Sequence, residues 1–68
     1  MEKAALSPRE CQVLLEAARG KTAEETGHRL QISKRTVEAH VRHARAKLKA
    51  RSLTHAVVLA IKKSLIKV

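Results

Sequence analysis

Apolar residues recur at helical spacing along this chain, and the sharpest pattern lies between residues 34 and 50. Val37, Val41, Ala44 and Leu48 fall within one narrow stripe when each successive residue is turned by about 100°. The other positions of that segment are polar or small. We therefore expect a helix over 34–50 whose apolar stripe packs inward and whose opposite face is free to meet a ligand.

Helix start signals precede each of four segments. The segments 7–10 and 22–25 read Ser-Pro-Arg-Glu and Thr-Ala-Glu-Glu, which is the spacing of a capping box, with a proline suited to the first helical position. Ser33 and Ser52 are N-cap candidates for two further helices. These signals predict helices over about 8–19, 23–30, 34–50 and 53–66.

The connection between the second and third predicted helices is unusually short. Only Gln31 and Ile32 separate the second helix from the cap at Ser33, which is typical of a helix-turn-helix pair. The chain shows no strand-like alternation and no internal repeat. We therefore predict an all-α fold: one four-helix domain over residues 1–68, with helices two and three forming a helix-turn-helix and a C-terminal dimerisation helix.

The last predicted helix, 53–66, is apolar nearly all round. Leu53, Val57, Ala60 and Ser64 form a stripe for the core, yet Val58 lies well round from it. Such a helix is either buried or exposed for a partner, and full burial is difficult in so small a domain. Dimerisation through this helix is our hypothesis, and a frayed, sticky C-terminus is the alternative. The expected dimer interface consists of Leu53, Val57, Val58, Ile61 and Leu65.

Charge divides the chain into two halves. Residues 1–32 carry five basic and five acidic side chains, whereas residues 33–68 carry ten basic and one acidic side chain, which together give the net charge of +9. A solvated helix face normally mixes both signs, but in residues 33–51 seven basic side chains are balanced only by Glu38. The surplus favours a polyanionic partner, with a merely solvated face as the alternative.

Composition narrows the class of partner. The chain has no Phe, Tyr or Trp, so it lacks the platforms on which single-stranded nucleic acids usually stack, and duplex binding is favoured. The lone Cys11 forms no internal disulfide and suits a reducing cytosol. The longest apolar run, 56–61, is too short to span a membrane, and the start Met1-Glu2-Lys3 is unlike a signal peptide. We expect a soluble intracellular domain with no membrane contact.

No pattern indicates catalysis or a bound metal. His40 and His43, with Glu25 and His28 on the preceding helix, superficially suggest a metal cluster. However, His28 is expected on a different face, and the surrounding positive charge would repel a cation. Cys11 has no obvious base beside it, and the chain has no glycine-rich phosphate loop. We therefore expect no enzyme activity, no cofactor and no metal site.

An ordered set of short motifs resembles the LuxR-type (GerE-like) helix-turn-helix domain. The motifs are Leu6-Ser7-Pro8-Arg9-Glu10, Val13-Leu14, Gly20-Lys21-Thr22, Glu25, Leu30, Ile32-Ser33, Thr36-Val37, His40-Val41, Lys47-Leu48, Thr54 and Ala56-Val57. The resemblance covers residues from about 5 to 66, and the series from Ser33 to Leu48 is its most specific part. It implies a four-helix bacterial transcription-factor module in which helix four supplies a dimer contact.

The resemblance also implies roles for individual residues. The residues that would face base edges are Glu38, Ala39 and Arg42. The residues that would contact or lie against the DNA backbone are Thr22, Thr36, His40 and Lys47. Helical geometry adds the neighbouring Lys34, Arg35, His43 and Arg45.

The chain departs from the family pattern at several positions. Thr26 and Gly27 stand where Ile and Ala are usual. Ala44 and Arg45 stand where two bulky aliphatic residues are usual, and Lys49 replaces a glycine that commonly ends the helix. Each loss of buried volume typically lowers the free energy of unfolding by about 1–3 kcal/mol when no other contact compensates. We therefore expect a weakly stable monomer.

These observations predict a sequence-specific regulator of transcription that binds double-stranded DNA as a homodimer in the bacterial cytoplasm, on the nucleoid. It would act alone or as the output domain of a longer receptor or response regulator. One alternative is a promoter-recognition domain like region four of a sigma factor, with RNA polymerase as its partner. Another is a small interaction module that heterodimerises with a related regulator and inhibits it.

Overall fold

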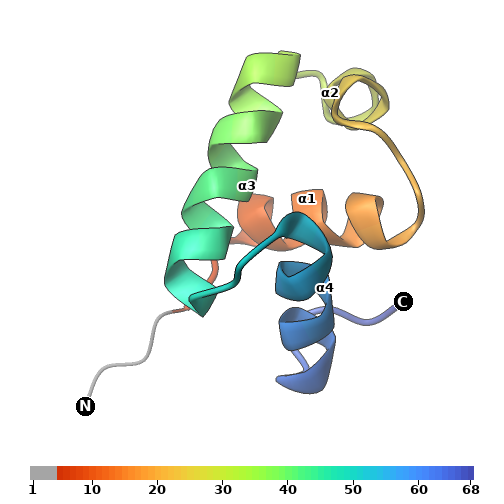
Figure 1. The fold of residues 1–68 in the computed structure, drawn as a ribbon. Coiled ribbons are helices and arrows are strands. Elements are labelled where there is room, and N and C mark those ends of the chain that lie inside the picture. Colours follow the sequence, from red (N-terminus) through yellow and green to blue (C-terminus); the bar gives the residue numbers. More distant parts are fainter. Residues whose placement is uncertain (1–4) are drawn as a thin grey trace.

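The computed structural model describes residues 5–68, so the expectation about Met1-Glu2-Lys3 lies outside the described residues. The described chain forms four helices and no strand: α1 (Pro8–Ala18), α2 (Ala23–Leu30), α3 (Lys34–Leu48) and α4 (Leu53–Lys62). Figure 1 shows α3 crossing α1, α2 joined to the start of α3 by a short turn, and α4 descending from the other end of α3. The predicted all-α, four-helix fold is confirmed. No helix among the described residues is long and apolar enough to cross a membrane.

Each helix begins at the residue that the sequence pattern marks as its cap. The Ser7 and Thr22 side chains accept hydrogen bonds from the backbone N–H groups of Glu10 and Glu25, whose carboxylates accept in return from the cap N–H groups. Ser33 and Ser52 cap α3 and α4 through single hydrogen bonds to the third helical residue. These caps satisfy N–H groups that have no partner inside the helix.

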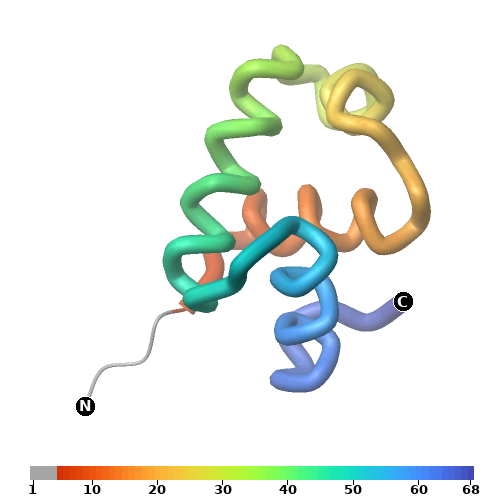
Figure 2. Tube along the Cα trace, viewed as in Figure 1, coloured from red at the N-terminus to blue at the C-terminus, as the bar shows by residue number. Residues whose placement is uncertain are grey.

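All four helices end in the same backbone motif. In each, one N–H bonds to the carbonyl three residues before it and the next N–H bonds to the carbonyl five residues before it, as in a Schellman motif. The first of these two residues adopts a left-handed conformation, which favours glycine. Here it is glycine only once; the four left-handed residues are Gly20, Gln31, Lys49 and Ser64. The path of the chain through the four turns can be followed in Figure 2.

The core is built from small aliphatic side chains. Leu14 of α1, Ala44 of α3, and Ala56 and Ala60 of α4 are fully excluded from solvent, and Leu48 is nearly so. Because alanine carries only a methyl group, the helices can approach closely where Ala44, Ala56 and Ala60 lie. The position of α2 is fixed in addition by an ion pair, in which Arg29 Nε lies 2.8 Å from Oε1 of the buried Glu16 on α1.

The end of α4 differs from the sequence expectation. The helix stops at Lys62 rather than near residue 66, because Ser64 turns left-handed and the Leu65 N–H bonds back to the Ala60 carbonyl. The chain then folds back so that Ile66 joins the core, with 7% of its surface exposed. The core-facing stripe of α4 is also shifted from its expected place. Ala56 and Ala60 are buried, whereas Leu53 and Ser64, which we expected in that stripe, are exposed.

Candidate nucleic-acid interface

The third helix, α3, has one buried apolar face and one exposed polar face, as its periodicity predicts. Val37, Ala44 and Leu48 are buried, and Val41 is half-buried beside them. The opposite face is exposed, and α3 carries five basic side chains against one acidic side chain. Because the apolar stripe fixes the rotation of α3 about its axis, the same residues that hold the core also determine which side chains face outward.

The side chains expected to contact DNA belong to α3, apart from Thr22, which is the N-cap of α2. Most are exposed, namely Thr22, Lys34, Arg35, Thr36, Glu38, Arg42, His43 and Lys47. Three are half-buried, namely Ala39, His40 and Arg45. Cys11 is half-buried, in contact with the core cluster.

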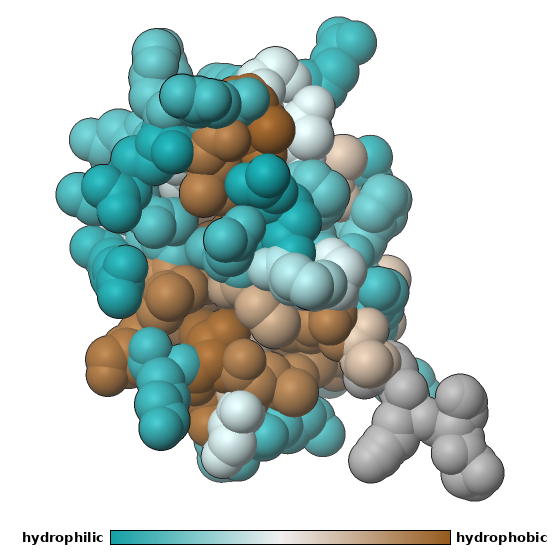
Figure 3. Space-filling view, turned by 180° about the vertical axis from the view of Figure 1, so that it is seen from behind, coloured by the Kyte–Doolittle hydropathy of each residue, from teal (hydrophilic) through white to brown (hydrophobic). Residues whose placement is uncertain are grey.

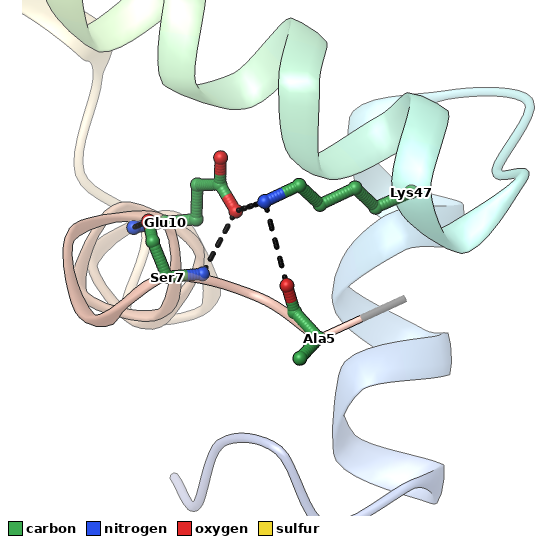
Figure 4. Close-up of polar contacts among 4 residues, drawn as sticks. All are labelled: Ala5, Ser7, Glu10 and Lys47. Carbon is green, nitrogen blue, oxygen red and sulfur yellow. Dashed lines mark hydrogen bonds and ion pairs between the residues drawn. The ribbon is translucent and has the colours of Figure 1, made fainter. Parts of the chain in front are cut away.

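Lys47 is joined to the first helix. Its Nζ donates to Glu10 Oε1 over 2.8 Å and to the Ala5 carbonyl over 3.4 Å. The same carboxylate oxygen accepts from the Ser7 N–H over 2.9 Å, so a single buried oxygen caps α1 and also holds α3 (Figure 4). Lys47 thus lies on the expected surface, but its charge is already paired within the domain.

The Glu10 carboxyl has a lowered pKa. Burial of this side chain raises the pKa, but hydrogen bonds from Lys47 and Ser7 and the positive charges of Lys47 and His43 outweigh burial. The result is a pKa below the ordinary value of 4.5. The exposed Glu25, at the cap of α2, also has a lowered pKa, chiefly because the Thr22 N–H donates to its carboxylate.

The turn between α2 and α3 depends on a glycine. A Cβ atom at Gly27 would lie 2.6 Å from the Ile32 carbonyl oxygen, which is far inside van der Waals contact. The turn passes directly over the helix at this point and leaves no room for a side chain. Gln31, in the left-handed conformation, and the Ser33 cap then direct the chain into α3.

Arg45 connects the surface to the turn that follows α3. Its Nη2 donates to the Arg51 carbonyl over 2.9 Å, while its Nε is buried and has no hydrogen-bond partner within residues 5–68. The Arg51 N–H donates in turn to Nδ1 of His55 over 3.0 Å. Both polar groups of the Arg51 backbone are therefore held by side chains, so the turn between α3 and α4 has a defined shape.

A second exposed surface is apolar and belongs to α4. Leu53, Val58 and Ile61 are 37%, 45% and 40% exposed, which is high for large aliphatic residues. The other two residues of the expected dimer interface, Val57 and Leu65, are half-buried against the core. Figure 3 shows hydrophobic side chains gathered on the back of the molecule, over its lower half, where α4 and the C-terminal segment lie.

The histidines do not gather into a metal site. Within residues 5–68 the structure contains no group of three or more His, Cys, Asp or Glu side chains that could hold a metal ion. His28 is exposed on α2, away from the core, as its helical position predicts. The site therefore consists of hydrogen-bond donors and positive charge on α3, with no metal-binding cluster among these residues.

Comparison with known proteins identifies the class. The GerE family model, described as bacterial regulatory proteins of the luxR family, matches residues 4–60. The chain belongs to this family, which consists of regulators of transcription that bind DNA and not of enzymes.

Curated relatives agree with the family match. The chain is 48% identical over 61 residues to the transcriptional activator protein BjaR1 of Bradyrhizobium diazoefficiens, covering 90% of this chain and 25% of the relative. It is 47% identical over 62 residues to the quorum sensing-dependent transcriptional regulator RpaR of Rhodopseudomonas palustris, covering 91% and 26%. It is 50% identical over 58 residues to the transcriptional activator protein SolR of Ralstonia nicotianae, covering 85% and 25%. The chain spans about a quarter of the length of these relatives.

Two features of this surface were not foreseen from the sequence. The pairing of Glu10 with Lys47 joins residues 37 positions apart, and neither residue has a local signal for it. The left-handed conformation of Lys49 was not expected, because glycine usually marks such a site. The substitution of lysine for the usual glycine was the only signal that this position is unusual.

Proposed function

We propose that this chain binds specific sites in double-stranded DNA as a homodimer and thereby regulates transcription in the bacterial cytoplasm. In this proposal α3 enters the major groove and α4 supplies the dimer contact. The proposal also takes residues 1–68 as a single DNA-binding domain. The observation that carries it is the outward face of α3, where exposed basic side chains surround the single acidic residue Glu38.

The geometry supports a division of roles among the exposed residues. Glu38 and Arg42 lie one helical turn apart on α3, where a carboxylate can accept from cytosine and a guanidinium can donate to guanine. Thr22 caps α2, and the free N–H groups at a helix start suit a phosphate of the DNA backbone. The ammonium of Lys47 is paired with Glu10, so we assign it mainly to holding α3 against α1.

The direct test is selection of bound duplexes from a random pool at two salt concentrations. We expect a two-fold-symmetric consensus with half-sites about one helical turn apart, and affinity that falls steeply as salt rises. Binding that does not change with salt, or a pool without any consensus, would contradict the proposal.

A matched pair of variants tests the role of Arg42. Arg42→Ala should weaken binding to the selected duplex by about ten- to one-hundredfold and relax the preference at one base position. Arg19→Ala removes the same charge from an exposed residue at the end of α1 and should leave the base preference unchanged. A consensus that is the same for Arg42→Ala and the unaltered chain would refute base reading by this residue.

The apolar surface of α4 supports a second candidate, heterodimerisation with a related regulator. The exposed Val58 and Ile61 suit any partner that presents a similar helix. Native mass measurement of the chain, alone and mixed with related regulators, distinguishes the two cases. A homodimer that binds DNA favours the first proposal, and a heterodimer that no longer binds DNA favours the second.

A further inference from the structure

The C-terminal half of α3 forms a shallow hollow with a strongly basic lining. Its volume is about 350 Å³, and its walls are Arg42, Arg45, Ala46, Lys49 and Ala50. Three of the five lining residues carry positive charge and none is acidic. The other two carry only methyl groups, so a ligand can approach the helix surface closely between the long basic side chains.

The positive charge of this hollow is not neutralised within the domain. No ion pair of Arg42, Arg45 or Lys49 is present in the described part of the chain, whereas Lys47, on the opposite flank of α3, is paired with Glu10. The two flanks of α3 are therefore unequal. An anion that approaches α3 is attracted more strongly to the flank that carries Lys49 than to the flank that carries Lys47.

Arg45 is held in place before any ligand arrives. One guanidinium nitrogen donates to the Arg51 carbonyl over 2.9 Å, while the buried Nε has no hydrogen-bond partner in residues 5–68. A guanidinium has five N–H donors, so this bond leaves donors available. Fixing the side chain in advance lowers the entropy cost of binding an anion.

Lys49 occupies a position that disfavours it. Its φ of 56° is left-handed, a conformation that costs a residue with a Cβ atom about 1 kcal/mol and that glycine adopts freely. Arg45 and Lys49 both add a basic side chain to the same hollow.

We propose that this hollow binds one phosphate of the DNA backbone, next to the bases that Arg42 reads. The inference rests on the proposed function, because it places the phosphate beside the same major groove. A DNA phosphate fits better than a small metabolite, because the hollow is open and shallow and Arg42 belongs to both the hollow and the base-facing surface.

The main test compares Lys49→Gln with Lys67→Gln on the selected duplex. Gln31 already adopts the left-handed conformation in this chain, so glutamine suits position 49. Lys67 is exposed in the segment that follows α4, and the C-terminus lies on the side of the molecule away from α3 (Figure 1). For each protomer, Lys49→Gln should reduce the slope of log affinity against log salt by about 0.9, which is about eightfold in affinity at 0.1 M salt. Lys67→Gln should reproduce the slope of the unaltered chain.

Phosphate ethylation interference then locates the contact. The unaltered chain should show interference at a phosphate adjoining the Arg42 base position, and Lys49→Gln should lose that signal while the base preference stays the same. Lys49→Arg should retain both the slope and the interference. Lys49→Gly relieves the backbone strain, so it should lose the contact although the folded domain becomes more stable, which separates loss of contact from loss of fold.

The possible failures are distinguishable. If the unaltered chain selects no consensus, the proposed function itself fails. If the chain selects a consensus but Lys49→Gln and Lys67→Gln have equal slopes and equal interference, the proposed phosphate contact is refuted while the proposed function stands. If inorganic phosphate by itself shifts the amide resonances of Ala46 and Ala50 while the DNA slope is independent of Lys49, the hollow binds free phosphate and the inference is overturned.

Discussion

The third and fourth helices follow the same local rules but leave different surfaces exposed. Both begin at a serine cap, both are followed by a left-handed turn, and both use alanine where they meet the core. The exposed face of α3 is charged, whereas that of α4 includes Val58 and Ile61. Capping and core packing therefore determine where each helix forms, while the residues that remain exposed determine which kind of partner the helix can bind.

The largest effect is expected when an aspartate replaces an apolar residue of α3, and the same replacement on α4 provides the comparison. Val37 on α3 is 2% exposed, so Val37→Asp would bury an unpaired carboxylate and should cost more than about 4 kcal/mol. Because a domain of this size is only marginally stable, we expect loss of the helical circular dichroism signal at 25 °C. A variant that remains helical and binds DNA would show that the α3 stripe does not support the core.

On α4 the same change should spare the fold and remove the dimer. Val58 is 45% exposed, so Val58→Asp should change the stability of the monomer by less than about 0.5 kcal/mol. Two carboxylates facing each other across a two-fold interface should weaken the dimer by at least about tenfold, as measured by sedimentation equilibrium. Val68→Asp, at a residue that is 73% exposed and outside the proposed interface, is the control and should leave the dimer intact.

The attachment of α3 to α1 predicts an intermediate effect. Glu10→Gln keeps the shape of the side chain but removes the ion pair with Lys47, so it should cost about 1–2 kcal/mol in urea unfolding. Glu24→Gln, on the exposed surface of α2, should cost less than about 0.5 kcal/mol. Equal midpoints for the two variants would contradict a stabilising role for the pair.

The same pair predicts a dependence of stability on pH. Because folding lowers the pKa of Glu10, the unfolded chain binds this proton more readily than the folded one. The stabilisation is therefore complete above the ordinary value of 4.5 and is lost as the pH falls through the lower pKa of the folded state. Unfolding curves measured down through this range should converge for Glu10→Gln and the unaltered chain.

The smallest expected effect compares the ends of the two helices. Lys49 is left-handed, so Lys49→Gly should stabilise the domain by about 1 kcal/mol and raise the melting temperature by about 4–8 °C. Lys63, at the end of α4, has φ of −89°, so Lys63→Gly gains no relief and should destabilise the domain by about 0.5–1 kcal/mol. Shifts of the same sign in both variants would show that the left-handed strain at Lys49 is negligible.

The features that depend on neighbouring residues could be predicted from the sequence. Capping is one example, since Ser7, Thr22, Ser33 and Ser52 each bond to a backbone group three residues away. The rotation of α3 is another, because the Val37, Ala44 and Leu48 spacing alone places the basic residues outward. The exposed positions of the candidate DNA contacts followed from that rotation.

The features that depend on distant residues could not be predicted. The Glu10 to Lys47 bond requires knowledge of how α1 crosses α3. The end of α4 was misjudged because Ser64 carries no helix-ending signal, and the burial of Ile66 in the core favours turning the chain back. The hollow at Lys49 likewise exists only when the last turn of α3 and Ala50 are seen together.

The close approach at Gly27 has a consequence for how the domain meets a duplex. A Cβ added at Gly27 would lie 2.6 Å from the Ile32 oxygen, so the backbone of the joint between α2 and α3 is closely packed. On the proposed interface, this close packing would hold Thr22 and Arg42 at a fixed separation. We expect duplexes whose groove width already fits that separation to bind without bending. Other duplexes must be deformed to bind, and the deformation energy of the DNA weakens their binding.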